Sequence, residues 1–247
     1  MKREHDPLII ACDLDNWEDV HSLAAALEGL VETVKIGLEA YLNLGPQVIT
    51  EMRERGFRVF GDLKFNDIPN TVSKAARALT RSGVNMMTLH ASGGREMLRA
   101  AVRASKEEAS LLGVSAPIML GVTVLTSCDE ATAREVGWTR PIREQVLSLA
   151  GLAIECGLEG VVASAREALL LRQELGEEPI IVTPGIRPAG SAVGDQVRTA
   201  TPQEALNAGA DYLVIGRAVT DADVPRAALE SIRIALGASR REGKRKA

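Results

Sequence analysis

The chain has 247 residues, 46% of them apolar, and its 29 lysine and arginine residues against 33 aspartate and glutamate residues give a net charge of −4. This length and composition are typical of a soluble globular protein and favour one domain over two. Residues 240–247 carry a charge of +4, which leaves −8 on residues 1–239, and aromatic residues make up only 3% of the chain, so binding to nucleic acid or to a membrane surface is not expected.

Apolar runs of strand length recur along the whole chain. They cover 8–14, 31–37, 57–63, 85–90, 117–125, 160–165, 179–184 and 212–216. Segments with helical spacing lie between them, at 20–30, 41–55, 71–83, 95–112, 142–157, 165–175, 202–209 and 224–236. The runs are continuously apolar, as in a parallel sheet that is covered by helices. Eight strand–helix units averaging about 31 residues predict an α/β fold with a single (β/α)8 TIM barrel.

A doubly wound open sheet is the alternative arrangement of such units. That fold commonly has a GxGxxG turn after its first strand, whereas the corresponding turn here is Asp13-Leu14-Asp15-Asn16-Trp17. We therefore predict a closed barrel over 1–239, followed by a basic, frayed tail at 240–247. The irregular stretch 187–196 follows the seventh predicted strand, and we expect it to be a lid over the barrel.

Neither a membrane span nor a signal peptide is predicted. No apolar run approaches the ~18 residues of a transmembrane helix, and the first residues lack the apolar stretch of a secretory signal. Cys12, Cys128 and Cys156 are far apart and show no CxxC spacing, so we expect reduced thiols. The predicted location is the cytoplasm.

Charged and polar residues gather where the predicted strands end. In a (β/α)8 barrel the carboxyl ends of the strands meet at one mouth, where the catalytic groups lie. The residues at these ends are Asp13, Lys35, Asp62, Lys64, Asp67, His90, Thr126, Ser127 and Arg217. We expect most of them to face one pocket, with His90 either contacting a ligand or lying at the barrel rim.

Four of these residues have alternating charges. Asp62 and Lys64 are two apart on one predicted strand and project to the same side. Asp67 lies just beyond them, and Lys35 comes from the neighbouring strand. Each ammonium group would then lie between carboxylates, which keeps those carboxylates ionised. A structural ion-pair cluster is the alternative, but such clusters add little stability, so a functional array is favoured.

A second group of residues is typical of a phosphate site. Barrels of this kind commonly bind phosphate on the loops after strands seven and eight. Those loops contain Thr183-Pro184-Gly185-Ile186-Arg187 and Gly216-Arg217. Arg187 and Arg217 offer forked donors to an anion, and Gly216 lets the backbone approach closely. Gln196, at the end of the predicted lid, could add an amide donor.

The segment Asp62-Leu63-Lys64-Phe65-Asn66-Asp67-Ile68-Pro69-Asn70-Thr71 resembles the signature of the orotidine 5′-monophosphate decarboxylase family. The other residues that occur in that family's order are Asp13, Lys35, Thr126, Ser127, Arg187, Gln196, Gly216 and Arg217. The resemblance extends over nearly the whole chain and is strongest to the bacterial group. It implies an enzyme without cofactor or metal that converts orotidine 5′-monophosphate (OMP) to UMP and CO2 in de novo pyrimidine biosynthesis.

The resemblance also implies a role for each site residue. Lys64 stabilises the charge that develops at C6 and then protonates that carbon. Asp62 lies beside the departing carboxylate, while Lys35 and Asp67 hold the array. Asp67 enters from the neighbouring subunit with nearby residues of its loop, so a homodimer with composite active sites is expected. The substrate-binding residues are Asp13 and Lys35 for the ribose, Thr126 and Ser127 for the pyrimidine, Arg187, Gln196, Gly216 and Arg217 for the phosphate, and also Asp62 and Thr71.

Two other functions remain as alternatives. Metal-dependent sugar-phosphate decarboxylases and aldolases of the same superfamily share the pattern DxKxxD, but they hold magnesium partly through a carboxylate at the end of strand two. This chain has Lys35 at that place, and its ammonium group would repel a divalent cation. A barrel that binds nucleotide without turnover is the second alternative, which the complete set of charged residues disfavours.

Overall fold

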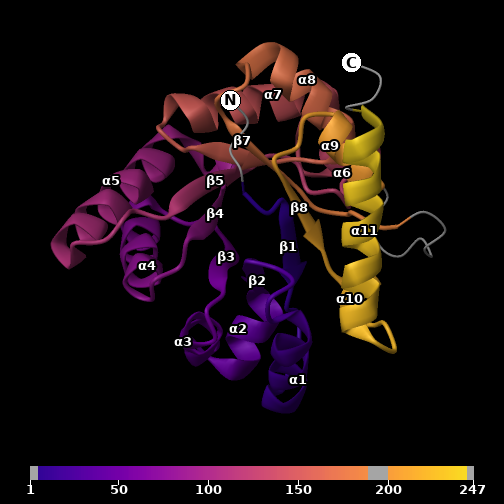
Figure 1. Ribbon diagram of the computed structural model, residues 1–247. Helices are drawn as coiled ribbons and strands as arrows, with labels where there is room; N and C mark the ends of the chain where they lie inside the picture. The colour runs from indigo at the N-terminus through magenta and orange to yellow at the C-terminus, as the bar shows by residue number, and fades with distance from the viewer. Residues whose placement is uncertain (1–4, 189–199, 244–247) are drawn as a thin grey trace.

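The computed structural model describes residues 5–188 and 200–243, with side chains described up to residue 237. Within these residues, eight parallel strands alternate with helices and close into a barrel (Figure 1). Neighbouring strands follow the order of the sequence, and β1 closes the barrel by pairing with both β2 and β8. The predicted (β/α)8 barrel is therefore confirmed.

The elements follow one another as expected for repeated strand–helix units. The strands are β1 (Leu8–Ala11), β2 (Thr33–Gly37), β3 (Arg58–Phe65), β4 (Met86–His90), β5 (Ile118–Val122), β6 (Gly160–Val162), β7 (Ile180–Thr183) and β8 (Tyr212–Ile215). The helices are α1 (Trp17–Leu27), α2 (Leu38–Leu44), α3 (Gln47–Glu54), α4 (Pro69–Arg81), α5 (Gly94–Leu112), α6 (Glu130–Glu135), α7 (Ile142–Glu155), α8 (Ala165–Leu175), α9 (Pro202–Asn207), α10 (Arg217–Thr220) and α11 (Pro225–Gly243), with a short 3-10 turn η1 (Ala91–Gly93) before α5.

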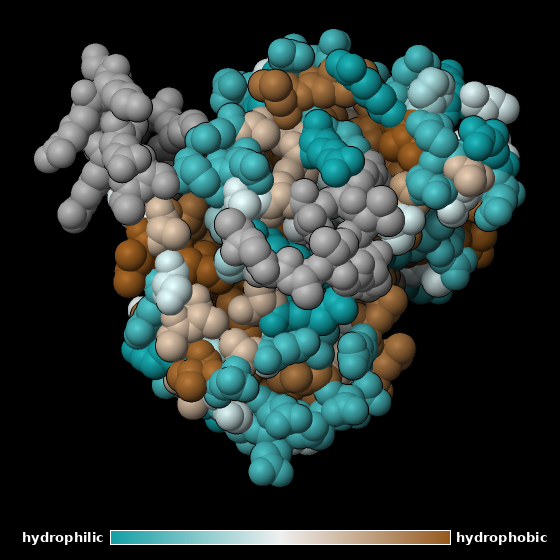
Figure 2. Space-filling model, turned by 90° about the vertical axis from the view of Figure 1, so that its right-hand side faces the viewer, coloured by the Kyte–Doolittle hydropathy of each residue, from teal (hydrophilic) through white to brown (hydrophobic). Residues whose placement is uncertain are grey.

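Apolar side chains form two packed layers. Alternate strand residues point into the barrel, where Ile9, Phe60, Met86 and Leu120 are almost completely buried against one another. The residues between them face the helices and form a larger cluster there. Burial of each such large side chain contributes about 1.5–3 kcal/mol. Figure 2 shows that hydrophilic and apolar residues are interspersed over one outer face.

Local capping signals set the beginnings of several helices. The Asn16 side chain accepts a hydrogen bond from the backbone N–H of Asp19 at the start of α1. Ser164 with Glu167 forms a capping box at α8, and Thr201 with Glu204 forms one at α9. These bonds satisfy backbone N–H groups that have no partner within the helix, so each helix begins directly after the loop at the barrel mouth.

The predicted helix 41–55 is wrong in one respect, because two helices occupy this region. Gly45 has a φ of 74°, a left-handed conformation that ends α2, and Pro46 then precedes α3. The helices α6 and α10 were not predicted, because six and four residues are too few for a periodic pattern.

Two predicted segments extend beyond the described residues. Helix α11 runs through Gly243, so it includes the first residues of the predicted tail 240–247, and the predicted boundary at residue 239 falls within this helix. Residues 244–247 lie outside the described part of the chain, as does the portion of the predicted lid from residue 189 onward. None of the helices in the described ranges has the length and apolar character that a membrane span requires.

Candidate active site

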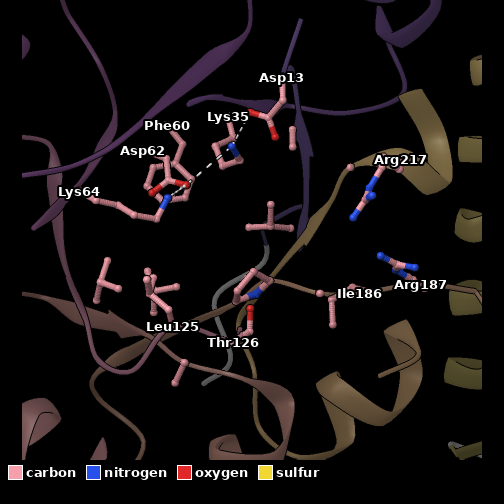
Figure 3. Close-up of a pocket in the computed structure, with 18 of the residues that line it drawn as sticks. Asp13, Lys35, Phe60, Asp62, Lys64, Leu125, Thr126, Ile186, Arg187 and Arg217 are labelled. Carbon is pink, nitrogen blue, oxygen red and sulfur yellow. Dashed lines mark hydrogen bonds and ion pairs between the residues drawn. The ribbon is translucent and has the colours of Figure 1, made fainter. Parts of the chain in front are cut away.

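A pocket of about 270 Å³ opens at the carboxyl ends of the strands (Figure 3). Its charged and polar lining comprises Asp13, Lys35, Asp62, Lys64, Thr126, Arg187 and Arg217, and its apolar lining includes Ala11, Phe60, Val122, Val124, Leu125, Val162, Ile186 and Val214. Residues from β1, β2, β3, β5, β6, β7 and β8, or from the loops that follow them, thus meet at one mouth. This convergence follows from the parallel arrangement of the strands.

Lys35 projects from β2 toward two carboxylates. Its Nζ lies 2.8 Å from Oδ1 of Asp13 and 3.7 Å from Oδ2 of Asp62, and only 10% of its side chain is exposed. Gly37 follows on the same strand, and a Cβ atom there would lie 2.7 Å from Oδ1 of Asp13 and 2.9 Å from Nζ of Lys35. The Asp13–Lys35 pair therefore occupies space that any residue larger than glycine would take at position 37.

Asp62 and Lys64 meet through a bulge in β3. Between the pairs Gly61↔Met87 and Phe65↔Leu89, β3 advances four residues while β4 advances two. Lys64 has a φ of 50° and is the one non-glycine residue with a positive φ in the described ranges. Its Nζ donates to Oδ2 of Asp62 at 2.7 Å. The predicted contact is present, but it depends on the bulge and not on the regular alternation of a strand.

Thr88 of β4 lies opposite this bulge. Its hydroxyl donates to Oδ1 of Asp62 at 2.9 Å and accepts the backbone N–H of Lys64 at 3.0 Å. The two carboxylate oxygens of Asp62 are thus divided between different partners. Oδ1 binds the Thr88 hydroxyl, while Oδ2 faces the ammonium groups of Lys64 and Lys35.

The electrostatic balance of the pocket keeps Asp62 ionised. Burial alone opposes the charge on this carboxylate. The ammonium groups of Lys35 and Lys64, together with hydrogen bonds from Lys64 and Thr88, outweigh burial and hold the pKa of Asp62 below its ordinary value. Asp13, Lys35, Asp62 and Lys64 therefore form an alternating array of two negative and two positive groups.

Arg187 and Arg217 lie on another side of the pocket, away from Lys64 and Asp62 (Figure 3). Arg187 follows β7, and Arg217 begins α10 directly after β8. Gly216 lines the pocket beside Arg217. Two guanidinium groups at one end of a pocket are suited to binding an anion such as phosphate.

The sequence prediction placed more residues at this mouth than the single chain brings together. Asp67 is exposed, does not line the pocket, and accepts the backbone N–H of Ile68 at 2.6 Å. Thr71 is exposed in the first turn of α4, and Ser127 is exposed next to the pocket residue Thr126 without lining the pocket. The expected array of four charges including Asp67 is thus not assembled by one chain. Gln196 lies outside the described residues.

His90 is half-buried at the end of β4 and does not line the pocket. Burial and the positive charge of Lys64 lower its pKa, and the negative charge of Asp62 only partly opposes them. Cys12 is buried beside Asp13, and burial together with the Asp13 charge raises the pKa of its thiol to about 12. This thiol therefore stays protonated at neutral pH and is a poor nucleophile.

Sequence reasoning missed Thr88 and the apolar walls of the pocket. Phe60, Val122 and Val162 line the pocket, but apolar residues near strand ends also occur throughout a barrel core, so no sequence signal separates them. Thr88 did carry a signal, because it is a polar residue within the buried run Met86–His90. In the described ranges, no group of three or more histidine, cysteine, aspartate or glutamate side chains is arranged to hold a metal ion.

The chain is similar to known proteins over most of its length. The model of the orotidine 5′-phosphate decarboxylase / HUMPS family matches residues 6–232. The chain is 51% identical over 228 residues to an orotidine 5′-phosphate decarboxylase of Moorella thermoacetica, covering 92% of this chain and 90% of the relative. It is 46% identical over 229 residues to one of Vibrio parahaemolyticus, covering 93% and 97%. The solved structure of orotidine 5′-phosphate decarboxylase from Lactobacillus acidophilus is similar with a TM-score of 0.81 at 38% identity, covering 92% of this chain and 97% of that one.

Proposed function

Because the chain belongs to the orotidine 5′-phosphate decarboxylase family and is a carboxy-lyase that forms UMP from OMP, we propose that the alternating array of Asp13, Lys35, Asp62 and Lys64 carries this reaction. The observation that supports the proposal is the ammonium group of Lys64, which lies 2.7 Å from a buried, ionised Asp62 inside the pocket. A cation that is fixed in this way can stabilise a carbanion without a cofactor.

The distribution of charge in the pocket supports one orientation of the substrate. Arg187, Gly216 and Arg217 bind the phosphate, together with Gln196. Asp13 and Lys35 contact the ribose, and Thr126 and Ser127 contact the amide edge of the pyrimidine. The orotate ring then lies with C6 near Lys64 and its carboxylate near Asp62.

Lys64 has two roles in the proposed reaction. The bond between C6 and the carboxylate carbon breaks, CO2 leaves, and the electron pair stays on C6 in the plane of the ring, where the π system cannot delocalise it. The Lys64 ammonium group stabilises this pair and then transfers a proton to C6, leaving a neutral amine that solvent reprotonates. Asp62 repels the bound carboxylate of the substrate but does not penalise neutral CO2.

The phosphate is remote from C6, so its binding energy can support the reaction only indirectly. Remote binding energy of this kind can hold the reacting end of the substrate against Lys64 and Asp62. The lid expected at 187–196 stays a prediction. Arg187, in the described part of this segment, lines the pocket, and residues 189–196 lie outside the described part of the chain.

The active enzyme is proposed to be a homodimer with composite sites. Asp67 is charged and exposed, and it lies outside its own chain's pocket although it belongs to the same segment as Asp62 and Lys64. A second copy could receive this carboxylate, together with Thr71, beside its own lysines. The cytoplasmic location stays a prediction.

The assay that tests the proposal follows the loss of orotate absorbance when OMP is added to the purified protein in the presence of a chelator. Full activity is expected, since the array consists of side chains of the protein alone. An enzyme that the chelator inactivates and magnesium restores would support the sugar-phosphate alternative. UMP binding without turnover would support the non-catalytic alternative.

A further inference from the structure

Thr88 contacts two members of the charged array through one oxygen atom. Its side chain is completely buried, and its hydroxyl lies within hydrogen-bond distance of both Oδ1 of Asp62 and the backbone N–H of Lys64. An ionised carboxylate can only accept, so the hydroxyl proton must point to Asp62. A lone pair of the same oxygen then accepts the N–H of Lys64, which a hydroxyl can do at the same time.

The hydrogen bond to Asp62 sets the rotation of its carboxylate. Oδ1 is directed toward β4 by Thr88, so Oδ2 faces the pocket, where it lies 2.7 Å from Nζ of Lys64 and 3.7 Å from Nζ of Lys35. Without the hydroxyl, Oδ1 would be a buried acceptor that lacks this partner, and the carboxylate could turn to satisfy both oxygens with the lysines.

The hydrogen bond to Lys64 supports the bulge in β3. Thr88 lies between Met87 and Leu89, the two β4 residues that pair with Gly61 and Phe65 on either side of the bulge. The Thr88 hydroxyl therefore lies at the bulge, where β3 has two more residues than the paired stretch of β4. The left-handed backbone of Lys64 is sparsely populated by non-glycine residues and persists only where its surroundings hold it.

We propose that Thr88 is a positioning residue for the decarboxylation, because its single hydroxyl holds both the Lys64 backbone and the Asp62 carboxylate in the arrangement that meets the substrate. This proposal rests on the functions proposed above for Lys64 and Asp62. Thr88 does not line the pocket, so its effect is transmitted through these two residues.

The test compares Thr88→Val with Thr88→Ser. Valine has nearly the shape of threonine but no hydroxyl, whereas serine keeps the hydroxyl. We expect kcat for Thr88→Val to be about 10- to 100-fold lower, with KM changed by less than about threefold, because the reacting groups and not the phosphate contacts are misplaced. Thr88→Ser should restore most of kcat. The matched control is Thr80→Val, which removes another buried hydroxyl that binds Ala76 O and Ser105 Oγ between α4 and α5.

The pH profile separates positioning from a general loss of stability. The charged groups that face Asp62 are Lys35 from β2, Lys64 from β3 and His90 from β4. Asp13, which follows β1, is linked to Asp62 through Lys35. Loss of the Thr88 hydrogen bond to the charged form should raise the pKa of Asp62. The acidic limb of kcat should therefore move to higher pH in Thr88→Val, and it should stay in place in Thr88→Ser and Thr80→Val.

A measurement without turnover keeps this proposal distinct from the proposed function. A carboxyl-carbon NMR titration of Asp62 should show a higher pKa in Thr88→Val, and the Lys64 amide should exchange faster with solvent. These two changes test the positioning role even if the wild-type chain fails to decarboxylate OMP. If Thr88→Val folds poorly, Thr88→Ser against Thr88→Ala isolates the same hydroxyl. Wild-type kcat, pH profile and Asp62 titration in the variants without the hydroxyl would overturn the proposal.

Discussion

The Nζ atom of Lys64 lies 2.7 Å from Oδ2 of Asp62, and the two side chains meet because the strand that carries them is bulged. In this arrangement a cation and an anion occupy the same side of the pocket. Ion pairing of this kind holds the ammonium group in place before substrate binds, so little reorganisation is required when charge develops at C6.

Lys64→Ala should abolish turnover while it preserves binding. We expect kcat to fall roughly 10³-fold or more, because the variant loses both the stabilising charge and the proton donor. The affinity for UMP, measured by titration calorimetry, should change little, since the phosphate and ribose contacts remain. Lys106→Ala is the control, because Lys106 lies on α5 with 55% of its side chain exposed. A Lys64→Ala enzyme with turnover within about tenfold of wild type would exclude Lys64 as the proton donor.

Arg217→Ala should weaken the reaction of OMP but not that of orotidine, the substrate without phosphate. Loss of a charge-assisted hydrogen bond is expected to lower kcat/KM for OMP about 10- to 150-fold. The same substitution should leave the much slower reaction of orotidine unchanged, because Arg217 has no contact with that substrate. The control is Arg58→Ala, because Arg58 is an exposed arginine at the first residue of β3, the end of that strand away from the pocket. This substitution should change the reaction of neither substrate. An equal loss for both substrates would place Arg217 elsewhere than at the phosphate.

Mixing two inactive variants tests the composite site. Lys64→Ala lacks the lysine but keeps Asp67, whereas Asp67→Ala keeps the lysine. If Asp67 acts in the partner's pocket, refolding the two together should produce hybrid dimers with one intact site each. When equal amounts of the two variants pair at random, about half of the dimers are hybrids, and each hybrid has one intact site of its two. The expected activity is therefore about a quarter of wild type.

The hybrid experiment also has a defined negative outcome. Each separate variant, refolded alone, is the control and should stay inactive. If Asp67 acts within its own chain, every site of a hybrid lacks one of the two groups, and no activity returns. Sedimentation of the wild-type chain as a monomer at the assay concentration would likewise contradict a composite site.

His90 should make the fold less stable at acidic pH. Its pKa is lowered in the folded state, mainly by burial, whereas in the unfolded chain it is close to 6.5. At a pH between the folded and the unfolded pKa of His90, the unfolded state binds more protons than the folded state. The free energy of unfolding should therefore decrease as pH falls below about 6.5. Thermal unfolding of His90→Gln at several pH values from 7.5 to 5 should show a shallower decline than wild type.

The control for this prediction is a histidine at the surface. His21 lies on α1, and 47% of its side chain is exposed. His21→Gln should keep the decline that is due to His90. The explanation would be wrong if His90→Gln and wild type lost stability in parallel over the whole range.

The sequence by itself determined the barrel and most of the pocket. Strand and helix identity depend on local periodicity, and eight such units in order are sufficient to indicate a closed parallel barrel. Parallel strands bring their carboxyl ends to one mouth, so Asp13, Lys35, Asp62 and Arg217 could be assigned to one pocket from their places at strand ends. The helix predicted at 165–175 likewise has the bounds of α8.

Only the tertiary structure decided how the site is held. The bulge at Lys64 is a mismatch between the registers of β3 and β4, and register depends on strand pairing between residues that are distant in sequence. For the same reason, the contacts of Thr88 with Asp62 and Lys64 were not predicted. The position of Asp67 outside its own pocket also depends on the path of the chain after the bulge. Residue type and spacing thus indicate which groups take part, whereas non-local pairing sets their orientation.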